Sequence, residues 1–218
     1  VPYNGASSGS RSDTLRNMLT LSKGVIGGDF DVVHSFGRIA YLLPLLSLPI
    51  PKLMTYQREI TPTSVAQGHR LSRGTLHFSA ISQWMMADVK HLGNWHLVYN
   101  GVPMRAYDFV PAVSDDAPLV FLGRIEQIKG THLAIEIAQR TGRRLVIAGN
   151  IPPVHQVYFD EQVKPHLDDE RITYIGPVDD KQKNVLLGSA AAFLMPILWE
   201  EPFGIVMAEA LACGTPVL

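Results

Sequence analysis

The chain has 218 residues and a formal net charge of −1 with 18% charged residues, so no basic field favours nucleic acid or an anionic membrane. This length can bury a core, in one large domain or two small ones. The single cysteine, Cys213, excludes an internal disulfide framework and suits a reducing compartment. The most apolar stretch, Ile39 to Ile50, is too short to span a bilayer.

The first hundred residues favour short buried strands that alternate with helices. Residues 1–9 are rich in Gly and Ser and favour a loop. Gly5 to Gly9 match the pattern G-x-S-x-G, but they lack the preceding apolar strand of a nucleophile elbow. The pattern predicts helices over residues 13–23, from 38 onward, 63–72 and 82–91, and strands over 30–35, 52–56, 76–81 and 96–99. Such alternation favours a parallel sheet covered on both faces.

The second half repeats this alternation after a break. Residues 104–117 show no clear period and are typical of a linker. The later pattern predicts strands over 119–122, 145–148, 172–175, 193–195 and 216–218, and helices over 128–140, 154–167, 180–191 and 203–213. We therefore expect an α/β chain with domains at 1–103 and 118–218, the second a doubly wound, Rossmann-like domain that binds ligands at the carboxyl ends of its strands.

The last predicted helix contains one charged residue. From Phe203 to Cys213 every residue is apolar or small except Glu209, and Gly214 follows at a helix-stopping position. A helix that is apolar on all sides is normally buried. A buried carboxylate needs a partner, so we expect that either a distant Lys or Arg or a ligand reaches Glu209.

The start of the same helix favours an anion. Its N-terminal amides, those of Phe203, Gly204 and Ile205, provide partial positive charge, and Glu201 flanks whatever approaches them. Gly204 leaves room for a ligand close to the backbone.

A second candidate segment, Gly123 to Gly130, follows the first strand of the second domain. There is no G-x-G-x-x-G or Walker A loop, so phosphate binding must use another device. Arg124 can hold phosphate oxygens bidentately and Lys129 can add a point charge, which together neutralise a diphosphate without a metal. Taken alone, two cations around a turn also fit a solvated loop.

These two segments resemble the signatures of retaining glycosyltransferases with the GT-B architecture, most closely family 4. Glu201 and Glu209 match its E-x7-E spacing, and Gly123-Arg124 with Lys129-Gly130 matches its "GR…KG" segment. Residues 100–103, Asn-Gly-Val-Pro, match its domain junction. The resemblance implies two Rossmann-like domains, both incomplete here.

The resemblance also implies roles for individual residues. Glu209 would bind the ribose hydroxyls of the nucleotide, and Glu201 would lie beside the transferred sugar. Arg124 and Lys129 would stabilise the departing nucleoside diphosphate. The turn that ends in Val178 would offer backbone groups to the base.

The sequence departs from the family in several places. The usual opening strand and Gly-rich loop are missing, and the chain stops before the usual closing segments. Gln57 stands where many members carry a His that contacts the donor sugar, and it cannot titrate, so Arg58 and Glu59 are further candidates for that contact. His34 ends a strand at the edge where a crevice is expected. It can serve a ligand there, and a structural role is an equal alternative. No histidines show metal-ligand spacing.

The sequence as a whole indicates a retaining, metal-independent glycosyltransferase. We expect catalytic roles for Glu201, Arg124 and Lys129, nucleotide contacts in the second domain, and a UDP- or GDP-linked sugar as donor substrate, with no separate cofactor. The acceptor is a saccharide, a lipid or a small molecule, and nucleic acid is not expected as a partner. The expected location is the cytoplasm, including the inner face of the membrane.

Three other functions remain open. A glycoside hydrolase also uses two carboxyl groups, but it needs no diphosphate clamp. A phosphorylase shares the architecture, but it would carry a pyridoxal-phosphate lysine on a much longer chain. A non-catalytic sugar-nucleotide-binding fragment is the principal alternative.

Overall fold

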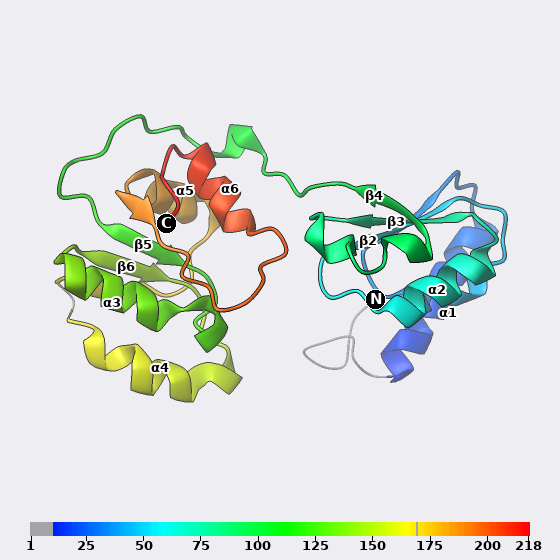
Figure 1. Cartoon of the computed structure of the whole chain (residues 1–218), viewed down its shortest axis with the longest axis horizontal. Helices are drawn as coiled ribbons and strands as arrows, with labels where there is room; N and C mark the ends of the chain where they lie inside the picture. The colour runs from blue at the N-terminus through cyan, green and yellow to red at the C-terminus, as the bar shows by residue number, and fades with distance from the viewer. Residues whose placement is uncertain (1–10, 169) are drawn as a thin grey trace. The chain divides into compact units, whose positions relative to one another are not determined.

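The computed structural model describes residues 11–168 and 170–218. The chain divides into two compact units, Val1–Asn100 and Gly101–Leu218 (Figure 1). The loop expected over residues 1–9, with its Gly5–Gly9 pattern, lies outside the described residues. Within the described ranges no helix combines the length and the apolar character that a membrane span needs.

The first unit is built on a parallel four-stranded sheet in the order β1-β2-β3-β4. Its strands are β1 (Val33–Ser35), β2 (Lys52–Tyr56), β3 (Leu76–Ala80) and β4 (Asn94–Leu97), and its α-helices are α1 (Arg11–Gly27) and α2 (Pro62–Ser72). Met54, Phe78 and Val65 form the centre of its core and are almost fully buried. The predicted parallel sheet is therefore confirmed.

Two segments of the first unit that were expected to be α-helices are 3-10 helices instead. The helix expected from residue 38 is a 3-10 helix, η1 (Ile39–Leu45), because Pro44 inside it lacks the amide hydrogen that an α-helix requires. The helix expected over residues 82–91 consists of two short 3-10 turns, η2 (Trp84–Met86) and η3 (Lys90–Leu92). Met85 and Met86, which lie in η2, are both buried, so packing outweighs helix propensity there.

The second unit contains a parallel sheet in the order β7-β6-β5-β8. Its strands are β5 (Leu119–Leu122), β6 (Leu145–Ala148), β7 (Ile172–Tyr174) and β8 (Ala192–Phe193). The fifth strand expected over residues 216–218 is present as a parallel bridge between Val217 and Phe193. Chain order runs outward from β5 in both directions, which is the doubly wound arrangement that the sequence predicts.

Helices cover both faces of this second sheet (Figure 1). They are η5 (Gln127–Lys129), α3 (Thr131–Thr141), η6 (Pro153–His155), α4 (Gln156–Gln162), η7 (Lys164–His166), α5 (Asp180–Gly188) and α6 (Ile205–Ala212). Ile135 of α3 and Phe159 of α4 pack in one core with Phe121. Leu187 of α5 and Ala210 of α6 pack in the other core. An apolar core thus lies on each face of the sheet.

Two helix boundaries in the second unit differ from expectation. Helix α3 begins at Thr131, after Gly130 in the left-handed conformation at φ 73°, so residues 128 and 129 form part of a 3-10 turn instead. The helix expected over residues 154–167 is an α-helix only in α4, between Pro153 and Pro165. Proline does not continue an α-helical ladder, which explains both interruptions.

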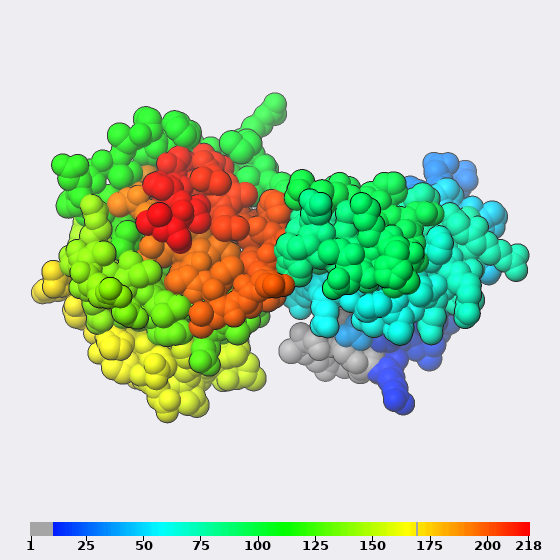
Figure 2. All heavy atoms as spheres, in the orientation of Figure 1, coloured from blue at the N-terminus to red at the C-terminus, as the bar shows by residue number. Residues whose placement is uncertain are grey.

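Helix α6 is shorter and less buried than expected. It ends as predicted: Gly214 is left-handed at φ 86°, and the amides of Gly214 and Thr215 donate to Leu211 O and Ala210 O. The expectation of burial on all sides is wrong, because Ile205 is 46% exposed and Leu211 is 62% exposed. In Figure 2 the orange-to-red segment that includes α6 forms part of the surface of its unit.

A buried lysine fixes one end of the first sheet. Lys52, at the start of β2, is 1% exposed, and its Nζ donates to Leu48 O, Ile50 O and Thr75 Oγ1 at 2.7–2.8 Å. These acceptors are all neutral, and no carboxylate among the described residues pairs with Lys52, so burial lowers the pKa of Lys52 below its ordinary value. Lys52 therefore connects the turn before β2 to the residue before β3, at an electrostatic cost.

Replacement of Lys52 tests this account. Lys52→Met leaves carbonyl groups without a donor and is expected to lower the free energy of unfolding by about 1–3 kcal/mol. Because the folded state lowers the pKa of Lys52, the unfolded state binds more protons, so the advantage of the parent chain over Lys52→Met grows as the pH rises toward the ordinary lysine pKa. Urea unfolding of both chains measures this difference, and a pH-independent difference would contradict the account.

Candidate functional site

A cavity of about 200 Å³ lies at the carboxyl ends of β5 and β8. Three segments line it: the loop after β5, the segment after β8 and the first turn of α6. The structure brings five of the predicted site residues together here, namely Arg124, Lys129, Glu201, Gly204 and Ile205. This is the edge of the sheet at which ligands of doubly wound folds bind.

The loop after β5 is held by backbone contacts. The amide of Gly123 donates to Ala148 O at 3.1 Å, and the amide of Ile125 donates to Asn150 O at 3.0 Å. A side chain on Gly130 would overlap the carbonyl of Pro196, so this approach requires glycine. The loop therefore presents Arg124 and Lys129 from a fixed backbone.

Two predicted catalytic residues contact each other directly. Lys129 Nζ donates to Glu201 Oε2 at 2.5 Å, and both side chains are less than one fifth exposed. Lys129 Nζ also lies 4.8 Å from the ring centroid of Trp199, within range of a cation–π interaction. The ion pair connects the loop after β5 to the segment that precedes α6. An anion that binds Lys129 would therefore share the charge of this lysine with Glu201.

Another carboxylate, Glu126, pairs with Arg124, and no role for it was expected from the sequence. It is 3% exposed, and its Oε1 lies 2.9 Å from Arg124 Nη2 without the alignment of a hydrogen bond. Its Oε2 lies 3.3 Å from His155 Nε2. Arg124 is 53% exposed, so its guanidinium is anchored at one side and open to solvent at the other.

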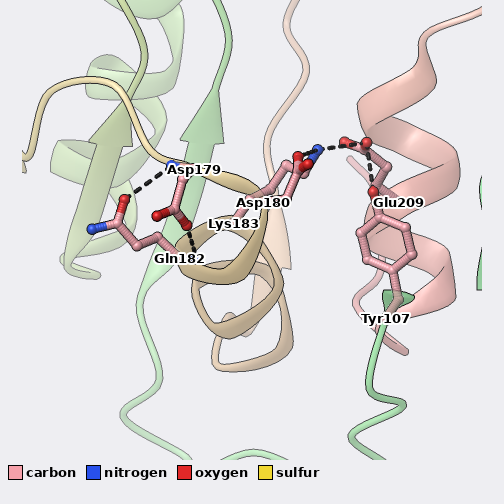
Figure 3. A network of polar contacts seen from close by, with 6 residues as sticks. All are labelled: Tyr107, Asp179, Asp180, Gln182, Lys183 and Glu209. Carbon is pink, nitrogen blue, oxygen red and sulfur yellow. Dashed lines mark hydrogen bonds and ion pairs between the residues drawn. The ribbon is translucent and has the colours of Figure 1, made fainter. Parts of the chain in front are cut away.

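Glu209 is buried as predicted, at 6% exposed, and a distant lysine reaches it. Lys183 Nζ donates to Glu209 Oε1 at 2.7 Å, and the hydroxyl of Tyr107 donates to the same oxygen at 2.6 Å (Figure 3). Sequence periodicity indicated neither partner, since Lys183 lies on α5 and Tyr107 lies in the predicted linker. The only signal was that a buried carboxylate requires a cation.

The protonation of this cluster follows from its contacts. Burial alone would lower the pKa of Lys183, but hydrogen bonds to Glu209 and Asp180 outweigh it, and the pKa lies above its ordinary value. Burial, followed by the hydrogen bond to Glu209, raises the pKa of Tyr107. At neutral pH the lysine is therefore charged, and the phenol is neutral and able to donate.

Four predicted contacts lie outside the cavity or differ from expectation. Phe203, Val178 and Glu209 are not among its lining residues. Helix α6 begins at Ile205, and Gly204 precedes it in the left-handed conformation at φ 75°, so the amides of Phe203 and Gly204 do not belong to the helix. This backbone conformation requires glycine at position 204, in addition to the space for a ligand that was expected there.

The first unit has its own cavity of about 410 Å³, lined in part by Gln57, Arg58 and Glu59. The amide of Gln57 is paired with that of Asn100, at 2.9 and 3.2 Å. His34 does not line this cavity, and its Nε2 lies 2.8 Å from Thr55 Oγ1. That contact fits the structural role considered for His34.

Solved structures of known proteins share this fold. The HepE protein of Anabaena, solved in complex with UDP and glucose, matches with a TM-score of 0.71 and 18% identity over 98% of this chain and 64% of its own. Sucrose-phosphate synthase from Thermosynechococcus elongatus matches with a TM-score of 0.75 and 18% identity over 94% of this chain and 60% of its own. These structures confirm the α/β fold of the GT-B type.

Sequence comparison gives the family. The model of the family described as "Glycosyl transferases group 1" matches residues 106–218. A phosphatidyl-myo-inositol mannosyltransferase of Propionibacterium freudenreichii is 30% identical over 92% of this chain and 55% of its own length. Its counterpart in Mycolicibacterium smegmatis is 26% identical over 100% of this chain and 60% of its own. The chain thus spans somewhat more than half the length of these relatives, and it belongs to the glycosyl transferases group 1 family.

Proposed function

We propose that this protein is a retaining glycosyltransferase that transfers a sugar from a nucleotide-diphospho-sugar to an acceptor hydroxyl without a metal ion. The observation that carries the proposal is that Arg124, Lys129 and Glu201 line one cavity at the ligand-binding edge of the second sheet. The two cations suit a diphosphate, and the carboxylate suits a sugar hydroxyl.

In the proposed mechanism, Arg124 and Lys129 contact the diphosphate and stabilise the negative charge that develops as the glycosidic bond breaks. Glu201 orients the sugar and steadies its positive reacting carbon. The acceptor hydroxyl attacks from the face that the diphosphate leaves and gives its proton to the departing diphosphate oxygen, so no protein nucleophile is needed. Glu209 binds the ribose hydroxyls.

Only the names and ligands of the relatives narrow the choice of donor and acceptor. Two of these are named phosphatidyl-myo-inositol mannosyltransferases, and the HepE structure contains UDP and glucose. The family resemblance implies a UDP- or GDP-linked donor, so both nucleotides belong in the first test. The proposed location, the cytoplasm or the inner face of the membrane, rests on the family resemblance.

Nucleotide binding tests the diphosphate contact. We expect the chain to bind UDP or GDP without added metal, and we expect Arg124→Ala to weaken binding roughly 10- to 100-fold. A hydrogen bond to a charged group contributes about 1.5–3 kcal/mol, and each 1.4 kcal/mol is tenfold in affinity. Isothermal titration calorimetry measures both constants.

The matched control is Arg140→Ala. Arg140 is 77% exposed on α3, where it pairs with Glu136 and lines no part of the cavity. This variant should bind the nucleotide as the parent chain does. Equal affinities of the Arg124→Ala variant and the parent chain would contradict the proposed contact.

The stereochemistry of donor hydrolysis tests the retaining mechanism. With acceptor omitted, water takes its place, and an α-linked donor should release the α anomer of the sugar first. Proton NMR of the anomeric hydrogen, recorded before mutarotation, identifies that product. Release of the β anomer would contradict retention, and nucleotide binding without any release would favour the non-catalytic alternative.

A further inference from the structure

One oxygen of Glu209 carries both of its side-chain contacts. Lys183 Nζ and the hydroxyl of Tyr107 both donate to Oε1, at 2.7 and 2.6 Å. A carboxylate oxygen has two acceptor positions, so these donors occupy Oε1 fully. Within residues 11–168 and 170–218, Oε2 forms no side-chain hydrogen bond or ion pair. Glu209 does not itself line the cavity, but it lies one turn along α6 from Ile205 and Val206, which do. The two acceptor positions of Oε2 are equal in number to the two hydroxyls of a ribose.

The two donors are themselves held in place. Lys183 also contacts Asp180 Oδ1 at 3.1 Å, and it lies in the first turn of α5. Asp179 caps that helix by accepting from the Gln182 amide, while the Gln182 side chain accepts from the Asp179 amide (Figure 3). The capping box fixes the turn from which Lys183 reaches Glu209.

Tyr107 is held by the residues that follow it in the chain. The amide of Asp108 donates to Asn184 Oδ1 at 2.9 Å, and Asn184 Nδ2 donates to Asp108 Oδ2 at 2.7 Å. The amide of Val110 donates to Cys213 O at 2.9 Å. Residues 108–110 are thus attached to α5 and to the end of α6, so the hydroxyl of Tyr107 reaches Glu209 from an anchored segment.

The charge of Lys183 makes the arrangement possible. An uncompensated buried carboxylate would be strongly destabilising. The ion pair with Lys183 supplies the compensating charge, and the contacts of Lys183 and Tyr107 with Oε1 leave Oε2 available.

We propose that Tyr107 and Lys183 are positioning residues that hold Glu209 Oε1, so that Oε2 accepts from the ribose hydroxyls of the nucleotide donor. This inference rests on the proposed function, specifically on the ribose contact of Glu209. It assigns a role in donor recognition to a residue of the predicted linker.

The test compares UDP or GDP, whichever the chain binds, with the matching 2′,3′-dideoxy nucleotide by titration calorimetry. Tyr107→Phe removes only the hydroxyl, and it should weaken binding of the ribonucleotide about 3- to 10-fold and leave the dideoxy nucleotide unchanged. A purely structural role would weaken both nucleotides alike. Tyr158→Phe is the matched control, since the hydroxyl of Tyr158 contacts His132 and not the site.

Lys183→Arg and Glu209→Gln complete the test. Lys183→Arg keeps the charge and should preserve at least part of the preference for ribose. Lys183→Met removes the charge and should abolish the preference, with thermal unfolding used to verify that the variant is folded. If Tyr107→Phe has no effect, or weakens both nucleotides equally, the positioning role is overturned.

The same titrations distinguish an error in the roles of Tyr107 and Lys183 from an error in the proposed ribose contact of Glu209. If the parent chain prefers the ribonucleotide and Glu209→Gln loses this preference, the ribose contact stands whatever Tyr107→Phe does. If the parent chain binds both nucleotides equally, the ribose contact itself is wrong, and the positioning role falls with it.

Discussion

The buried carboxylate of Glu209 is the constraint on which the second unit depends. An uncompensated charge at 6% exposure would be strongly destabilising. The contacts with Lys183 and Tyr107 meet that requirement, and they join α6 to α5 and to the segment after the first unit. The group that we propose to bind the ribose is thereby also a structural link between three segments.

The candidate phosphate site follows the same principle of paired charges. Lys129 is paired with Glu201, and Arg124 is paired with Glu126. Each cation is thus held in place before a ligand arrives, which lowers the cost of ordering it on binding. Arg124 is more than half exposed, whereas Lys129 must share its charge with Glu201. This difference makes Arg124 the more accessible of the two cations.

The strands were predictable from the sequence, whereas the contacts between elements were not. The buried runs at residues 52–56, 119–122 and 145–148 match β2, β5 and β6, because a short apolar run between turn signals has few alternatives. The 3-10 turns near Met85 have the same apolar content as an α-helix, so packing alone distinguishes them. The burial of Glu209 was predictable from its apolar neighbours, but Tyr107 lies where no period exists, and its contact spans 102 positions in the chain.

The central claim is that a nucleoside diphosphate binds at the carboxyl edge of β5 and β8 and reaches Glu209. Hydrogen–deuterium exchange of the chain with and without UDP or GDP tests it most directly. We expect slower amide exchange in residues 123–130 and 204–212, with the sheet of the first unit unchanged. Protection confined to the first unit, or none at saturating nucleotide, would contradict the claim.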